Sequence, residues 1–83
     1  MTSVYLVRGR LFGLLKDYER AEADFKKAAA LEPDNGQAYY NLALVAYYKG
    51  KKALVGPLIK KSQNLGYKID PLSLMVISSV PKK

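Results

Sequence analysis

Residues of similar size and character recur in this chain at a constant spacing of about 34 positions, so that Tyr5 matches Tyr39 and Phe25 matches Ile59. A period of this length is typical of proteins that stack pairs of antiparallel helices, because one pair alone cannot bury its apolar face. The chain of 83 residues has room for two such pairs and a short tail. The spacing therefore predicts an all-α fold of helix-turn-helix units.

The stretch DYERAEADFKKAAALEPDN, residues 17–35, shows how one unit ends. Its apolar residues recur at three- and four-residue steps, which predicts an amphipathic helix with Asp17 as its N-cap. Glu22 stands four residues before Lys26, the favourable order for an exposed ion pair. Pro33 cannot continue the helix, so the first unit is expected to end there.

A second unit begins directly afterwards. Asp34 stands three residues before Gln37, which predicts a capping box at the start of the helix QAYYNLALVAYYKG. Gly50 suits the left-handed position at the end of that helix. Apolar residues cover almost its whole circumference, so it must be packed from more than one side.

The first unit resembles the tetratricopeptide repeat, through the signature residues Tyr5, Gly9, Phe12, Ala21, Phe25, Ala28 and Pro33. Arg8 departs from the pattern, which usually has leucine there. The second unit keeps Tyr39, Leu42, Ala43 and Gly50, although Pro57 falls inside its second helix. The resemblance implies a single domain with one repeat at about 3–34 and another at about 36–68.

The ends of such a stack need to be covered. Asp70 can cap and Pro71 can open a third element, a capping helix at about 70–80 with Leu72, Met75, Val76 and Val80 along one side. That makes about five helices in all. The beginning of the chain has no such cover, so we expect partial exposure of Val4, Val7, Leu11 and Leu15.

The net charge of +7 lies entirely in the second half of the chain. From Leu42 onward there are eight lysines and one acid, Asp70, whereas the charges before it cancel. We expect the following lysines to steer an acidic partner: Lys49, Lys51, Lys52, Lys60 and Lys61. The alternative of a basic nucleic-acid-binding module is the less favoured one, since that role needs bases stacked on aromatic rings beside the charges.

Composition argues against several other functions. The chain has no histidine and no cysteine, and six of its seven acids lie in the surface pattern of the first half, so we expect neither an enzyme nor a metal or cofactor site. The lack of cysteine also gives no sign of an oxidising compartment, and we expect a cytoplasmic protein. The apolar tail LSLMVISSV is too short to span a membrane.

The resemblance implies that the first helix of each unit lines a concave groove that binds extended peptides or helices. Tyr40, Leu44, Tyr47 and Tyr48 follow helical spacing and form one stripe, and four further residues are expected beside it: Leu6, Arg10, Gln37 and Asn41. The expected function is a protein-protein interaction module that binds an acidic peptide or helix of a partner. Two alternatives stay open: the tyrosines pack against the tail or a sister chain, or the chain self-assembles into a homo-oligomer through its first helix.

Overall fold

The computed structural model describes residues 1–78, with side chains described through residue 75, and it is built from helices alone in this part of the chain. The five helices are α1 (Thr2–Leu14), α2 (Tyr18–Leu31), α3 (Gly36–Tyr48), α4 (Lys52–Asn64) and α5 (Pro71–Ser78). The starts of α3 and α4 follow those of α1 and α2 at the spacing of the sequence repeat. The all-α fold predicted from the sequence is therefore confirmed.

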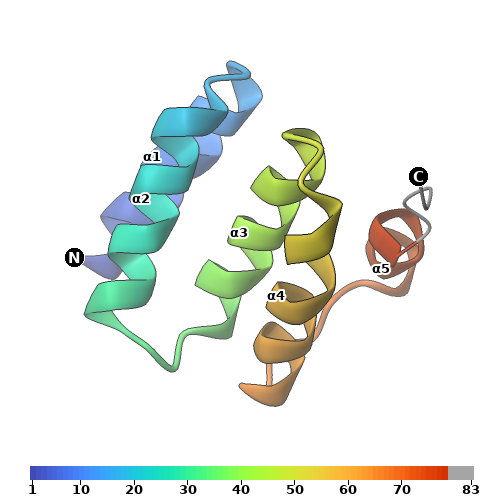
Figure 1. The fold of residues 1–83 in the computed structure, drawn as a ribbon. Coiled ribbons are helices and arrows are strands. Elements are labelled where there is room, and N and C mark those ends of the chain that lie inside the picture. The colour runs from blue at the N-terminus through green and yellow to red at the C-terminus, as the bar shows by residue number, and fades with distance from the viewer. Residues whose placement is uncertain (79–83) are drawn as a thin grey trace.

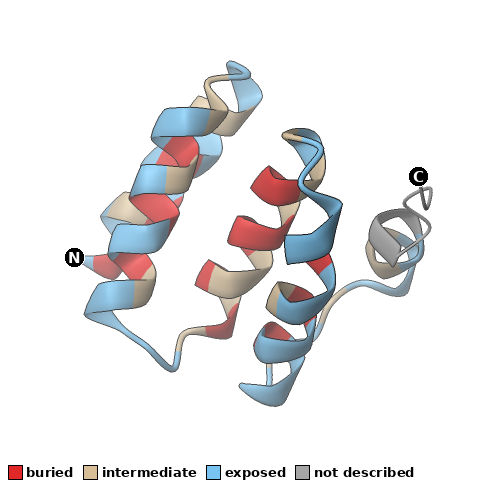
Figure 2. Cartoon of the chain, viewed as in Figure 1, coloured by how far each residue is buried: buried red, intermediate tan, exposed pale blue. Residues whose placement is uncertain are grey.

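The helices form two hairpins side by side, α1 with α2 and α3 with α4, and α5 packs against α4 at the far end (Figure 1). Helix α3 lies in the middle, packs against α2 and α4 and also touches α1. Much of α3 is consequently buried, whereas α4 presents a largely exposed side (Figure 2). Of the expected capping helix, residues 79 and 80 and the side chain of Val76 lie outside the described residues.

Hydrogen bonds confirm the predicted N-caps of α2 and α5. The carboxylate of Asp17 accepts a bond of 3.3 Å from the backbone N–H of Arg20, and Asp70 accepts from the first turn of α5. Gly50 has the left-handed φ of 77° that a helix-ending glycine favours. Pro57 lies within α4, which continues through it from Lys52 to Asn64.

The predicted cap of α3 by Asp34 is wrong. The helix begins at Gly36, so Asn35 takes the capping position, and its side-chain oxygen accepts bonds from the N–H groups of Gln37 and Ala38 at 3.0 and 3.3 Å. The Asn35 side-chain amide in turn donates to Glu32 at 3.0 Å. Asp34 lies one residue too early to reach these N–H groups.

Two clusters of buried side chains hold the helices together. The first joins α1, α2 and α3 through Leu6, Ala21, Phe25, Ala28, Ala38, Leu42 and Val45. The second joins α3 to α4 through Ala43, Ala46, Val55 and Ile59, with Ile69 and Leu74 from the tail packed against it. Alanine is frequent in both clusters because small side chains let the helix axes approach closely.

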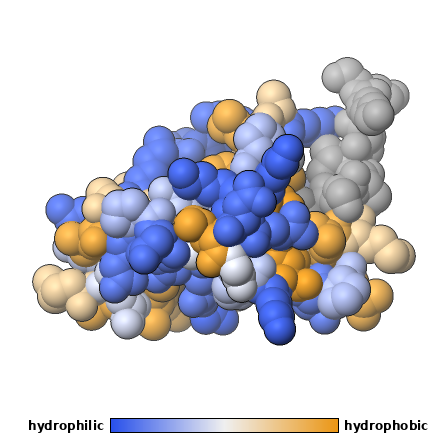
Figure 3. Space-filling model, turned by 90° about the horizontal axis from the view of Figure 1, so that it is seen from below, coloured by the Kyte–Doolittle hydropathy of each residue, from blue (hydrophilic) through white to orange (hydrophobic). Residues whose placement is uncertain are grey.

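Seen from below, hydrophilic side chains cover the centre of the molecule, with hydrophobic ones between and around them (Figure 3). Within the described part of the chain, no helix combines the length and the apolar character needed to cross a membrane.

Gly36, at the start of α3, lies close against the end of α4 and the residues that follow it. A β-carbon added there would lie 2.7 Å from Cβ of Tyr67 and 2.9 Å from the carbonyl oxygen of Ser62. We expect Gly36→Ala to lower the free energy of unfolding by about 1 to 3 kcal/mol, because backbone atoms cannot move aside cheaply. Urea unfolding followed by circular dichroism measures this loss.

Gly13→Ala is the matched control, since a β-carbon at this helical position meets nothing within 4 Å. Its substitution should leave stability unchanged or raise it by up to about 1 kcal/mol. Equal losses for the two variants would contradict the close approach at Gly36.

Candidate functional site

A groove of about 370 Å³ runs between α1 and α3, the first helices of the two hairpins. Gly13 on α1 leaves open space along one wall, because a β-carbon added there would meet nothing within 4 Å. The full lining is Gly9, Arg10, Gly13, Leu14, Lys16, Tyr18, Phe25, Asn41, Leu44, Val45 and Tyr48. Most of these side chains are apolar, and none of them is acidic.

Four of the eight groove residues predicted from the sequence line this groove: Arg10, Asn41, Leu44 and Tyr48. Leu6 does not, because its side chain is buried in the first core cluster. Gln37 lies elsewhere, in a hollow beside the α2–α3 connection and Tyr67.

Tyr40 and Tyr47 also lie outside the groove lining. Both pack against the second core cluster, which joins α3 to α4. The ring of Tyr40 lies 5.3 Å from that of Tyr67, measured between centroids. The predicted tyrosine stripe thus divides between two faces of α3.

Tyr18 is a groove residue that the sequence analysis missed. Its ring stacks on that of Tyr48 at 5.5 Å between centroids and 9° between planes, which joins the start of α2 to the end of α3. Tyr47 meets Tyr48 edge-on at 5.5 Å. Tyr18 was not predicted because it lies at the start of the second helix of its hairpin, and only the first helices were expected to line the groove.

Phe25 and Gly9 were singled out in the sequence as repeat-signature residues but were not assigned to the groove. In the structure the Phe25 ring lies directly against Gly9, so close that a β-carbon there would be 2.5 Å from Cε1. The same pair that lets α1 and α2 approach therefore also forms part of the groove lining.

Asn41 is the most unusual polar group of the groove. The residue is only 5% exposed, and its side-chain nitrogen Nδ2 is buried without a hydrogen-bond partner among the described residues. Leaving a buried amide donor unpaired costs about 1 to 3 kcal/mol.

The groove also has two cations at its edge, Arg10 and Lys16. Neither forms an ion pair in the part of the chain that the structure describes. Arg8, by contrast, points to the other side of α1 and donates two hydrogen bonds of 2.9 Å to the carboxylate of Asp24. These bonds raise the pKa of Arg8 above its ordinary value.

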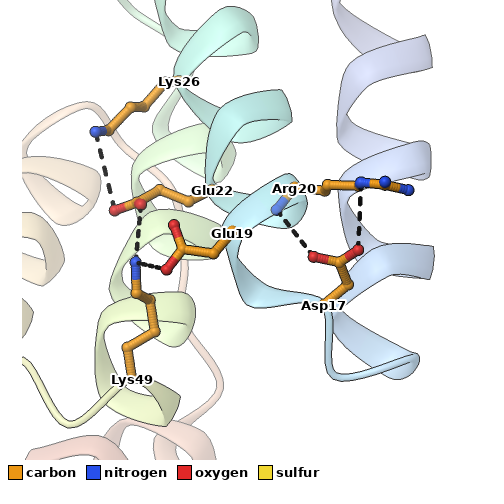
Figure 4. Close-up of polar contacts among 6 residues, drawn as sticks. All are labelled: Asp17, Glu19, Arg20, Glu22, Lys26 and Lys49. Carbon is orange, nitrogen blue, oxygen red and sulfur yellow. Dashed lines mark hydrogen bonds and ion pairs between the residues drawn. The ribbon is translucent and has the colours of Figure 1, made fainter.

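Lys49 differs from the other lysines predicted to steer a partner. Its Nζ lies 3.0 Å from Glu19 and 3.1 Å from Glu22, and its side chain is only 12% exposed (Figure 4). Hydrogen bonds to Glu19 and Glu22 raise the pKa of Lys49. The ion pairs fasten the end of α3 to α2, next to the stacked tyrosines that line one end of the groove.

Glu22 takes part in the same cluster, and Lys26 also approaches it, at 3.9 Å. Burial works to raise the pKa of Glu22, but the hydrogen bond from Lys49 and the charges of Lys26, Lys49 and Lys51 outweigh it and lower the pKa below its ordinary value of 4.5. A carboxyl group with a lowered pKa stabilises the fold at pH values above its ordinary pKa. This stabilisation is lost as the pH falls through the lowered pKa.

We therefore expect wild type to be more stable than Glu22→Gln at neutral pH, and this difference to shrink at acid pH, below about 4.5. Urea unfolding at a series of pH values measures it. In a Lys49→Gln background the difference at neutral pH should be smaller. A difference that stays constant from neutral to strongly acid pH would contradict the coupling.

The remaining steering lysines are exposed and have no carboxylate partner among the described residues: Lys51, Lys52, Lys60 and Lys61. They lie on α4 or at its start. Lys61 lies over the ring of Tyr39, with Nζ 5.1 Å from the ring centroid.

Comparison with known proteins gives one family. Residues 2–35 match the sequence model of the tetratricopeptide repeat. A search of curated proteins gave no match, and a search of solved structures gave none either. The matched segment contains both helices of the first hairpin. Repeats of this family typically serve protein-protein interaction without catalysis. Residues 2–35, which form α1 and α2, are therefore similar to a tetratricopeptide repeat.

Proposed function

We propose that this protein is an interaction module that binds a segment of a partner protein in the groove between α1 and α3. The observation that carries the proposal is the buried, unpaired Nδ2 of Asn41 in an otherwise apolar groove. An unsatisfied donor at such a place binds an incoming acceptor without first giving up a bond of its own. The second hairpin acts in this proposal as a second repeat, because α3 supplies the opposite wall.

The occupant is an extended segment rather than a helix. The carbonyl groups inside a helix already accept bonds from its own N–H groups, whereas those of an extended chain are free to accept from Asn41. Leu44, Val45 and Tyr48 offer apolar contact for one or two side chains of the segment on either side of this bond.

The occupant also has a carboxylate next to its apolar residues. Arg10 and Lys16 line the groove, have no ion pair among the described residues and face no acidic lining residue. A carboxylate near Arg10 gains a charge-assisted hydrogen bond, which is stronger than one between neutral groups.

The exposed lysines of α4 act at longer range in this proposal. They attract an acidic partner before it docks, and such attraction weakens as salt screens it. A nucleic acid is the less favoured occupant, because the tyrosine rings are already engaged: Tyr39 with Lys61, Tyr40 with Tyr67, and Tyr18 with Tyr48. They offer few free faces for stacked bases.

Selection from a random peptide library displayed on phage tests the proposal, with the full chain immobilised. We expect the selected peptides to share an acidic residue close to an apolar one. Arg10→Glu should weaken their binding by about tenfold or more, measured by fluorescence anisotropy, because it places a carboxylate where one is to be bound.

Lys27→Glu changes the charge by the same amount at an exposed position of α2 outside the groove lining, and serves as the control. Its binding should stay close to wild type. Selected peptides without acidic residues, or equal losses for both variants, would contradict the proposed site.

A further inference from the structure

Helix α1 presents a second apolar face, opposite the one that packs inside the molecule. Val4, Val7, Leu11 and Leu14 form this outer stripe, with 57%, 56%, 55% and 80% of their surfaces exposed. Their spacing of three, four and three residues is that of the a and d positions of a coiled coil, which pack against a partner helix. Leu6 and Gly9, which are buried, lie on the opposite side of α1.

The equivalent positions of the second hairpin, one repeat further along the chain, show what covers such a face. Val4 corresponds to Ala38 and Leu11 to Val45, and both of these α3 residues are buried in the first core cluster with Phe25 of α2. In the second hairpin, the equivalent face of α3 is therefore packed against another helix, α2. At α1 the same face has no helix against it within the described residues.

The charges beside the stripe indicate which helix would fit. Arg8 and Arg10 flank it, in the positions where coiled-coil partners place opposite charges, and α1 has no acidic residue. Arg8 already binds Asp24, but its side chain remains 56% exposed. Pairing α1 with the α1 of a second copy would therefore bring arginine near arginine and supply no carboxylate.

We propose that the outer stripe of α1 binds an amphipathic helix of another protein, whose apolar residues are flanked by carboxylates. This surface adjoins the groove, and the two share Leu14 and the flanking Arg10. The binding free energy comes from burying the stripe, and the carboxylates select the partner and its orientation.

A designed helical peptide of about three heptads serves as the probe, with leucine at a and d and glutamate at e and g. A matched peptide carries lysine at e and g. Like charges keep each peptide from pairing with itself. We expect the glutamate peptide to bind the full chain about tenfold or more tightly than the lysine peptide, by isothermal titration calorimetry at moderate salt.

Val7→Glu and Leu11→Glu should each weaken binding of the glutamate peptide by about tenfold or more, because each places a charge in the apolar contact. Both residues are exposed, so circular dichroism should show the variants folded. The variant Lys27→Gln, at an exposed position of α2, controls for the general effect of removing a surface charge and should bind nearly as wild type does.

Three outcomes would overturn the inference. The first is equal binding of both peptides, and the second is binding that is lost in Lys27→Gln but kept in Leu11→Glu. The third is that the chain alone sediments as a dimer that Leu11→Glu dissociates, because a second copy would then occupy the stripe.

Discussion

Phe25→Ala is expected to lower the free energy of unfolding by about 3 to 5 kcal/mol. Phe25 is 3% exposed and belongs to the cluster that joins α1, α2 and α3. Removing the ring leaves a cavity that Gly9, which has no side chain, cannot fill. A domain of 83 residues has a total stability of roughly 4 to 12 kcal/mol, so this loss is a large share of the whole.

Urea unfolding followed by far-ultraviolet circular dichroism measures the loss. Phe12→Ala provides the control, because it removes the same ring from a partly buried position where the guanidinium of Arg20 lies 5.7 Å above it. Phe12→Ala should lower the free energy of unfolding clearly less than Phe25→Ala does. Equal costs would contradict the placement of Phe25 at the centre of the core.

Asn41→Leu is expected to change stability and binding in opposite directions. Leucine branches at the same atom as asparagine and removes the buried Nδ2 that has no partner among the described residues. The free energy of unfolding should therefore rise, by about 1 to 3 kcal/mol. Binding of a groove-selected peptide should weaken by about tenfold or more, because the bond to the peptide carbonyl is lost.

Asn64→Leu is the matched control, since Asn64 is exposed on α4 and does not line the groove. Asn64→Leu should change neither the free energy of unfolding nor the binding of the selected peptide appreciably. An Asn41→Leu variant that is less stable than wild type would indicate that the amide already has a partner, and would remove the main support for the groove as a binding site.

The helices could be predicted from the sequence because their signals are local. The apolar period, the Asp17 cap, Pro33 and Gly50 each act within a few residues, and the repeat period is the spacing of the helices themselves. The missed cap at Asn35 shows the limit of this reading. Asp34 and Asn35 are both good capping residues, and only the geometry of the turn decides between them.

The groove was predicted less well, because it depends on how the hairpins meet. Along α3, Tyr40 and Tyr47 lie on nearly the same side, whereas Asn41, Val45 and Tyr48 lie about a quarter of a turn away. The spacing shows that these residues are neighbours on the helix. It does not show which of the two sides α1 leaves open and which side the second cluster covers.

Lys49 illustrates the same limit for charge. In the sequence it belongs with the lysines of the second half, but its carboxylate partners, Glu19 and Glu22, lie far earlier in the chain, on α2. Contacts over such separations follow from tertiary packing, which no local pattern encodes. The lysines of α4 are exposed and have no carboxylate partner among the described residues, and no acid lies close to them in the sequence.

The most direct test of the proposed groove is the side-chain amide signal of Asn41 in ¹⁵N-labelled protein, titrated with a library-selected peptide. The Asn41→Leu variant identifies the signal by its absence. The proposed site predicts that this signal moves as the peptide saturates the protein, together with the backbone signals of Gly9 and Gly13. If the peptide binds and these signals stay in place while those of α4 or the outer side of α1 move, the groove is not the binding site.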